Sequence, residues 1–262
     1  MAFEYHENEK IGLVLSGGGA RGAYQIGVWQ AMNELHIPFS IVTGTSVGAL
    51  NGAIMTQGDL NLAVDAWSEI TAKNVMNFES EADTSTKDGR REVVRAITEK
   101  AIREKSIDQT PLKHLIERYI VTDRVYRSPV DFGLTAVTYP QFQTIRLFKD
   151  EIPKEHLVDY LMASSACFPF FLPYTFNGTT YLDGGFSDNM PIQMAADRGA
   201  DRILAVDLKA VGVKRPYFNC RVPVTVIDSK ADLGFILLFD ADSSRMNIRR
   251  GYLDAMRVFG RC

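Results

Sequence analysis

The sequence lacks any apolar run long enough to span a bilayer. Its first ten residues are polar and of mixed charge, and they lack the apolar stretch of a secretory signal. We therefore expect a protein with no signal peptide or transmembrane segment, located in the cytoplasm and at most peripheral at membranes. Export by a route that uses no cleavable peptide remains open.

Cysteine is scarce, and positive charge is not in excess. Cys167, Cys220 and Cys262 are far apart and form no CxxC pair, which favours free thiols in a reducing compartment over disulfides or a zinc site. No His/Cys/Asp cluster has metal-ligand spacing, so no metal is expected. No organic cofactor is implied either. The formal net charge of -3 argues against nucleic-acid binding and strong electrostatic capture by anionic membranes, although it allows a local basic patch.

The chain has 262 residues, of which 46% are hydrophobic and 23% charged, as in an ordinary globular protein. This length suits one substantial core, so we predict a single domain over residues 1–262 with its core at about 11–228. The oligomeric state is not evident from these features.

Short apolar runs alternate with helical patterns. Helices are predicted over residues 23–35, from Val47 onward, and over 59–70, where Asp59 is a plausible N-cap. Strands are predicted over residues 11–16, 41–43, 132–138, 144–148, 179–182, 203–208 and 222–227, the last two as central parallel strands. The alternation predicts an α/β fold, a three-layer α/β/α sandwich with a mostly parallel central sheet. Ligand sites in such sheets form at the carboxyl ends of the strands.

Residues 80–91 form the clearest break in this pattern, because they are polar and contain nothing to bury. In the following residues, 92–105, Val93, Ile97 and Ala101 share one face of an amphipathic helix. The plainer interpretation of residues 80–105 is a surface excursion. The alternative is a mobile lid over the functional site.

The segment Gly44-Thr45-Ser46-Val47-Gly48 has the G-x-S-x-G pattern of a nucleophile elbow. A predicted strand precedes it and a predicted helix follows it, as that motif requires. The sharp turn exposes the serine hydroxyl, and the flanking glycines leave room for it. Backbone amides at the start of the helix favour developing negative charge. We therefore predict Ser46 as the nucleophile of an acyl-transfer reaction.

A second glycine turn follows the first predicted strand: Gly17-Gly18-Gly19-Ala20-Arg21-Gly22. It matches the G-x-G-x-x-G fingerprint of NAD(P)-binding modules, but the second strand has no acidic residue at its end to hold a ribose. The alternative is that the amides of Gly18 and Gly19 form an oxyanion hole near Ser46. Two glycine turns at neighbouring strand ends suit acyl transfer better than dinucleotide binding. Arg21 is either a surface charge or a residue that holds the loop.

Leu182-Asp183-Gly184-Gly185 follows the predicted strand 179–182. Alone it predicts a turn, but a serine hydrolase also needs a base. No histidine follows Asp183, which excludes a triad in the order Ser, Asp, His; the four histidines are His6, His36, His114 and His156. A different order through His114 or His156 stays open, although both lie in charged, helical surroundings.

These three motifs, in this order, resemble the patatin-like phospholipase family and its bacterial-type acyl hydrolases. The Ala-Ser-Ser-Ala stretch at 163–166, the Phe-Leu-Pro at 171–173 and the Asn-Met-Pro-Ile at 189–192 are also similar to that family. The resemblance runs from about residue 11 to the strand at 222–227. It implies residues 17–22 as the oxyanion loop, a Ser46–Asp183 dyad without histidine, and Gly184 and Gly185 as part of the acid motif.

The resemblance also implies hydrolysis of acyl esters in phospholipids, lysophospholipids, galactolipids or neutral lipids, with transient contact to a lipid aggregate. An acyl chain needs an apolar groove. We expect part of its lining from Phe168, Phe170, Phe171 and Leu172, and a second wall from residues 234–239, although such clusters are usually core. Cys167 lacks a nearby activating residue and is expected to be a buried thiol. A catalytically inactive lipid-binding scaffold is a further alternative.

Overall fold

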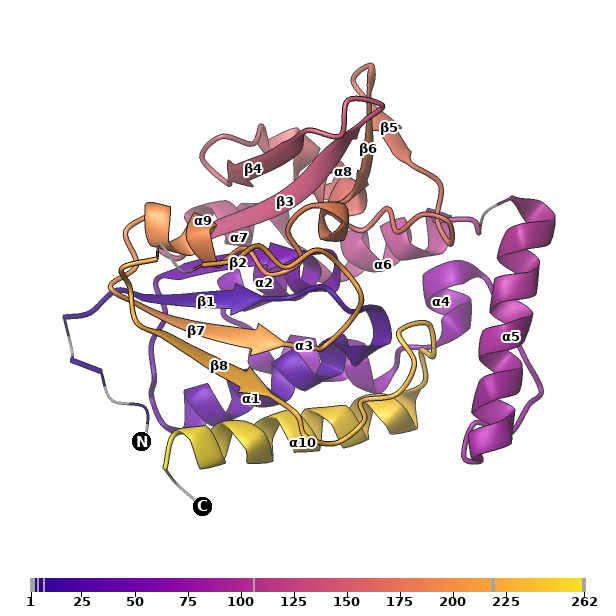
Figure 1. Cartoon of the computed structure of the whole chain (residues 1–262), viewed down its shortest axis with the longest axis horizontal. Helices are drawn as coiled ribbons and strands as arrows, with labels where there is room; N and C mark the ends of the chain where they lie inside the picture. Colours follow the sequence, from indigo (N-terminus) through magenta and orange to yellow (C-terminus); the bar gives the residue numbers. More distant parts are fainter. Residues whose placement is uncertain (1–2, 4, 7, 106, 218–219, 261–262) are drawn as a thin grey trace.

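The computed structural model describes residues 3, 5–6, 8–105, 107–217 and 220–260 (Figure 1). Within them, eight strands form one sheet, with the order β5-β6-β3-β2-β1-β7-β8 and with β4 paired to β3. The strands are β1 (Ile11–Leu15), β2 (Ile41–Thr45), β3 (Asp131–Tyr139), β4 (Thr144–Phe148), β5 (Tyr174–Phe176), β6 (Thr179–Asp183), β7 (Arg202–Asp207) and β8 (Val224–Asp228). The five neighbouring strands β3, β2, β1, β7 and β8 are parallel. β4 and β6 pair with β3 antiparallel, and β5 pairs antiparallel with β6. This confirms the predicted mostly parallel α/β fold.

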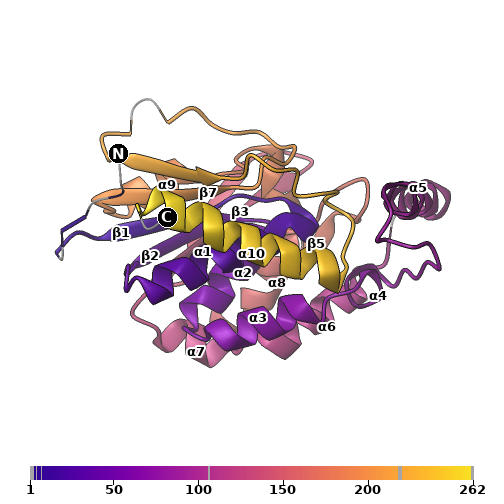
Figure 2. The same ribbon diagram turned by 90° about the horizontal axis from the view of Figure 1, so that it is seen from below.

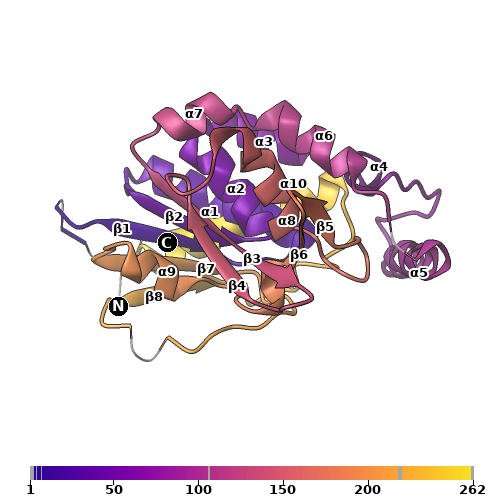
Figure 3. The same cartoon turned by 90° about the horizontal axis from the view of Figure 1, so that it is seen from above.

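Helices cover the two faces of the sheet unequally (Figures 2 and 3). The α-helices are α1 (Ala23–Glu34), α2 (Val47–Thr56), α3 (Leu60–Ser68), α4 (Ala72–Met76), α5 (Lys87–Glu104), α6 (Thr110–Tyr119), α7 (Thr122–Arg127), α8 (Leu157–Ser164), α9 (Ile192–Asp197) and α10 (Ala241–Val258). Alternate residues of β1 point to opposite faces, so Leu13 and Leu15 join the main core and Val14 joins the smaller core beneath α9. The second outer layer is thin, because α9 is its main helix.

Two sequence predictions about the sheet and the core differ from the structure. The strand predicted at 222–227 is not central, because β8 lies at the edge of the sheet. Of its five residues, only Ile227 is fully buried. The core extends beyond residue 228, because α10 packs along α1 and adds Ile248 and Ala255 to the main cluster. Cys262 lies outside the described residues.

The helix predicted over 92–105 begins earlier, at Lys87. Thr86 caps it, since its hydroxyl accepts a hydrogen bond from the Gly89 amide at 3.0 Å. Val93, Ile97 and Ala101 are buried on its inner face, as the periodicity predicted. In the part of the chain that the structure describes, no helix is both long and apolar enough to cross a membrane.

Candidate active site

Two strands end opposite neighbouring residues of β3, and this brings Ser46 and Asp183 together. β2 runs parallel to β3 as far as the pair Thr45–Thr135. β6 runs antiparallel to β3 as far as the pair Asp183–Ala136. β4 already occupies the other edge of β3 at these positions. Because a strand has only two edges, β2 and β6 lie along the same edge and meet at their carboxyl ends.

Ser46 lies on a strained turn between β2 and α2. Its φ of 55° and ψ of −128° are rare for a residue with a side chain. Strained backbone conformations of this kind are found most often at functional sites. A Cβ at Gly44 would overlap the backbone of Gly48, and a Cβ at Gly48 would overlap the carbonyl of Leu15. The two glycines therefore let the elbow pack against the end of β1.

Buried hydrogen bonds hold the elbow in place. The Ser46 amide donates to Oγ of Ser164 at 2.9 Å, and Ser164 is fully buried at the end of α8. Thr45 Oγ1 donates to the Asp188 carbonyl at 2.7 Å. Val47 is buried as the first residue of α2. Ser164 was not among the predicted site residues, because only the fold brings it to the elbow.

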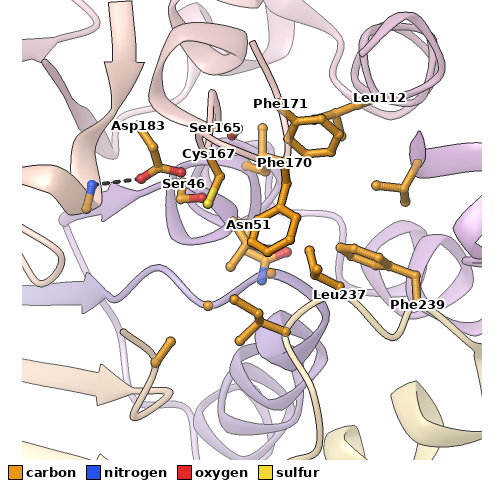
Figure 4. A pocket seen from close by; sticks show the side chains of 18 of the residues that line it. Ser46, Asn51, Leu112, Ser165, Cys167, Phe170, Phe171, Asp183, Leu237 and Phe239 are labelled. Atoms are coloured by element: carbon orange, nitrogen blue, oxygen red, sulfur yellow. Dashed lines mark hydrogen bonds between the residues drawn. The ribbon is translucent and has the colours of Figure 1, made fainter. Parts of the chain in front are cut away.

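Asp183 is buried, with 5% of its surface exposed, and faces Ser46 (Figure 4). Its Oδ1 accepts a hydrogen bond from the Gly185 amide at 2.7 Å. Burial raises the pKa of this carboxyl to about 6, and hydrogen bonding from the Ser46 side chain and the Gly185 amide opposes the rise. Gly184 packs so closely on Thr135 that a Cβ there would overlap it. The carboxylate thus lies beside a serine hydroxyl in a largely dry site.

The glycine loop lies beside the elbow, but only part of it is free to bind an oxyanion. The Gly17 amide donates to the Asn189 carbonyl at 3.1 Å, the Ala20 amide to the Ile236 carbonyl at 2.8 Å, and the Arg21 amide to the Gly18 carbonyl at 3.2 Å. Within the described residues, the amides of Gly18 and Gly19 have no such partner, and both glycines line the cavity that contains Ser46. Gly22 is buried at the start of α1. The predicted six-residue oxyanion loop therefore reduces to Gly18 and Gly19 as candidate donors.

Arg21 holds the glycine loop to the rest of the fold. Its guanidinium donates to the carbonyls of Gly234, Leu208 and Lys209 at 2.8, 3.1 and 2.9 Å. On the other side of the loop, the buried Asn51 of α2 donates to the Gly22 carbonyl at 3.0 Å. These contacts favour the second sequence interpretation of Arg21, a residue that holds the loop.

An apolar cavity of about 670 Å³ opens beside Ser46 and Asp183 (Figure 4). This volume lies within the roughly 300–1,000 Å³ of small-molecule sites. Phe168, Phe170 and Phe171 line it, as predicted from the sequence. Leu172 does not: the chain turns outward after Phe171, and the Leu172 side chain is 50% exposed. Of the second predicted wall, Ile236, Leu237 and Phe239 line the cavity.

A third wall of the cavity was not predicted. It is formed by side chains from α3, α4 and α6 and by two residues that follow α3 and α6, namely Ala66, Trp67, Ile70, Val75, Leu112, Leu115, Ile116, Tyr119 and Ile120. The spacing of Leu112, Leu115, Ile116 and Tyr119 indicates one apolar helix face, but only the fold shows that this face borders a cavity. No residue of 80–105 among those described lines it, which favours the surface excursion over the lid.

Two polar side chains near the dyad have distinct environments. Cys167 lines the cavity, and burial, with a smaller contribution from the Asp183 charge, raises the pKa of its thiol to about 12. A thiol so rarely ionised is a poor nucleophile. The buried Oγ of Ser165 also lies in the cavity wall and has no hydrogen-bond partner among the described residues. Ser46 is therefore the nucleophile that the environment favours.

The four histidines lie elsewhere: none of them lines the cavity. His156, a former candidate, contacts Asp159 at 3.3 Å and Asn177 at 2.9 Å, near the β5–β6 hairpin. Over the described ranges, no group of three or more His, Cys, Asp or Glu side chains is placed to hold a metal ion. The geometry thus supplies Ser46, the carboxylate of Asp183 and two free amides beside an apolar cavity.

Comparisons with known proteins agree with this geometry. The family model of patatin-like phospholipases matches residues 13–196. The lysophospholipase NTE1 of Chaetomium globosum is 28% identical over 217 residues, covering 79% of this chain but 12% of that protein. The NTE1 lysophospholipase of Candida albicans is 26% identical over 214 residues, covering 80% of this chain and 14% of its own length. The chain thus spans about an eighth of the curated relatives that it matches.

A solved structure, VipD from Legionella pneumophila, has a similar fold, with a TM-score of 0.56 and 14% identity over 96% of this chain and 67% of that one. The family match covers most of the chain, confirms the resemblance seen in the motifs, and comes from a family of lipid ester hydrolases. The chain belongs to the patatin-like phospholipase family.

Proposed function

We propose that this chain hydrolyses the acyl ester bonds of lipids through a Ser46–Asp183 dyad. The observation that carries the proposal is the meeting of β2 and β6 along one edge of β3, which places a strained serine beside a buried carboxylate. No specific observation favours the NAD(P) interpretation, because the glycine loop faces Ser46 and β2 ends without an acidic residue.

In the proposed acylation step, Ser46 Oγ attacks the ester carbonyl carbon while its proton moves to Asp183. The carbonyl oxygen becomes an oxyanion, which the amides of Gly18 and Gly19 stabilise. The bond to the leaving alkoxide then breaks, and Asp183 returns the proton to that oxygen. The product alcohol leaves, and the acyl group stays on Ser46 as an ester.

In the deacylation step, water gives a proton to Asp183 and attacks the acyl carbon. The bond to Ser46 breaks, the proton returns to Oγ, and a fatty acid leaves. A carboxylate of ordinary pKa is a weak base for this task. The burial that raises the pKa of Asp183 to about 6 makes it a better one and still leaves it ionised at neutral pH.

The apolar cavity supports an acyl chain as the part of the substrate that is bound. Two relatives are named lysophospholipases, which makes phospholipids with one acyl chain the first substrates to test. Diacyl phospholipids, galactolipids and neutral lipids stay open. Because such lipids form aggregates in water, the proposal includes transient contact with a lipid surface, and it requires neither a metal nor an organic cofactor.

The test is an assay of released fatty acid over lysophospholipid, diacyl phospholipid, triglyceride and short p-nitrophenyl esters. Ser46→Ala should abolish release from every substrate that the parent cleaves, and His156→Gln serves as the matched control that keeps it. Hydrolysis that survives Ser46→Ala would overturn the proposal. An unchanged chain that cleaves none of these esters would support the inactive lipid-binding scaffold instead.

A further inference from the structure

Some of the side chains that line the cavity are both apolar and exposed to solvent. Most lining residues are buried or half-buried, and the large apolar exceptions are Phe168, Phe186, Val211 and Val213. Val211 is 94% exposed, and the other three are 43–49% exposed. Phe168 follows α8, Phe186 follows β6, and Val211 and Val213 follow β7. Exposed apolar groups gathered around an apolar opening mark an interaction surface.

The loop that carries Val211 is held firmly in this position. Its Val213 amide donates to the Gly185 carbonyl at 2.8 Å, and the Val213 carbonyl accepts a hydrogen bond from the Asn189 amide at 2.6 Å. Gly185 and Asn189 both belong to the acid segment and line the same cavity. Val211 thus lies two residues before a point anchored to the acid segment, and its side chain is in water.

The segment that carries Val211 and Val213 is also positively charged. Residues 208–227 contain four basic residues and no acidic residue, within a chain of net charge −3. Lys209 and Lys214 pair with Asp228 and Asp207 at 3.0 and 2.6 Å. The exposed Arg215 instead donates to the Ser187 carbonyl and to Thr144 Oγ1, each at 3.0 Å. It has no acidic partner in the described part of the chain, and its contact with Ser187 places it next to Phe186.

We propose that Phe168, Phe186, Val211, Val213 and Arg215, here called the mouth surface, dock this chain on an anionic phospholipid surface. The apolar side chains enter the acyl boundary of the lipid layer, and Arg215 faces a headgroup phosphate. The choice of partner rests on the proposed function, because the four apolar side chains belong to the lining of the cavity that an acyl chain would enter. Docking in this orientation brings the ester to Ser46 without passage through water.

The helix α5 is the competing surface. It was the candidate lid, it extends to one side of the fold (Figure 1), and its Ile102 is 74% exposed. Neither Ile102 nor any other described residue of 80–105 lines the cavity. The mouth surface and α5 share no residue, so substitutions in the two surfaces make different predictions.

The test is cosedimentation with vesicles of phosphatidylcholine, with and without phosphatidylglycerol, in the Ser46→Ala background. This background separates docking from catalysis: a chain that hydrolyses nothing can still bind, and failure of the proposed function does not decide the result. Val211→Asp should lower the partition coefficient about tenfold, the effect of keeping one valine side chain out of the apolar layer. Ile102→Asp makes a matched change on α5 and should bind like its parent.

Arg215→Ser should weaken binding several-fold to vesicles with phosphatidylglycerol and hardly at all to pure phosphatidylcholine. Melting temperatures show whether each variant is folded. Unchanged binding by folded Val211→Asp, or loss of binding by Ile102→Asp alone, would overturn the proposal. So would a concentration-dependent dimer in sedimentation velocity that Val211→Asp dissolves, because the mouth surface would then contact a second copy of this chain.

Discussion

Asp183→Asn is predicted to remove activity and at the same time to stabilise the fold above pH 6. Burial raises the pKa of Asp183 from 3.8 to about 6, because the ionised form is poorly solvated in the folded state. The unfolded chain therefore loses this proton more readily than the folded one. The resulting cost to stability is absent below pH 3.8, grows as the pH rises to about 6, and is full above it.

The size of this cost follows from the shift. Two pKa units correspond to about 3 kcal/mol of unfolding free energy at pH 8. Asparagine keeps an oxygen that accepts from the Gly185 amide but carries no charge. We therefore expect Asp183→Asn to exceed the parent by up to about 3 kcal/mol at pH 8 and to match it near pH 4. Turnover should fall by a factor of ~10³ or more, because no other described side chain at Ser46 is a base.

The measurement is urea unfolding of both chains at pH 4 and pH 8, together with the hydrolysis rate of a soluble ester. Ser46→Ala is the control: it is equally inactive, but it leaves the buried carboxylate in place and should show no gain in stability at pH 8. A difference in stability that is the same at both pH values would refute the electrostatic account. Turnover retained by Asp183→Asn would refute its role as base.

The remaining predictions concern pH, the oxyanion donors and metals. Since Asp183 must be ionised, kcat/KM for a soluble ester should fall about tenfold per pH unit below about pH 6; a plateau down to pH 4 in a stability-controlled assay contradicts this. Gly18→Ala places a Cβ 2.8 Å from a methyl carbon of Leu208 and should lower kcat by a factor of ~10², the effect of one lost donor, whereas Gly178→Ala in the β5–β6 turn should not. Activity should survive EDTA; calcium-restorable loss would argue against a metal-free reaction.

Local motifs were enough to predict which residues meet at the candidate site, Ser46 and Asp183 beside a glycine loop. The glycines around Ser46, the strand before it and the helix after it are all determined by neighbouring residues, and each of these elements lies where it was expected. The absence of a histidine after Asp183 was equally visible in the sequence. No local pattern showed that β2 and β6 share one edge of β3, because this depends on how β2, β4 and β6 all pair with β3.

The cavity was harder to predict because its walls come from distant segments. The apolar faces of α3 and α6 resemble ordinary core faces, and periodicity does not show whether a face meets a neighbour or a void. Leu172 illustrates the opposite error, a residue predicted to line the cavity that does not. Its apolar side chain suits the cavity, but the backbone directs it to solvent. β8 was misplaced for a similar reason, since a β-branched run suits an edge strand with one covered face as well as a central one.

The most direct test of the central claim is labelling with a fluorophosphonate, read by intact mass and peptide mapping. The account predicts one adduct per chain, on Ser46, and slow or absent labelling in Asp183→Asn, which lacks the base that activates the hydroxyl. Ser165, also in the cavity wall, should stay unmodified. An adduct on Ser165 or another residue, or none on a folded chain that hydrolyses esters, would contradict the assignment of Ser46 as the nucleophile.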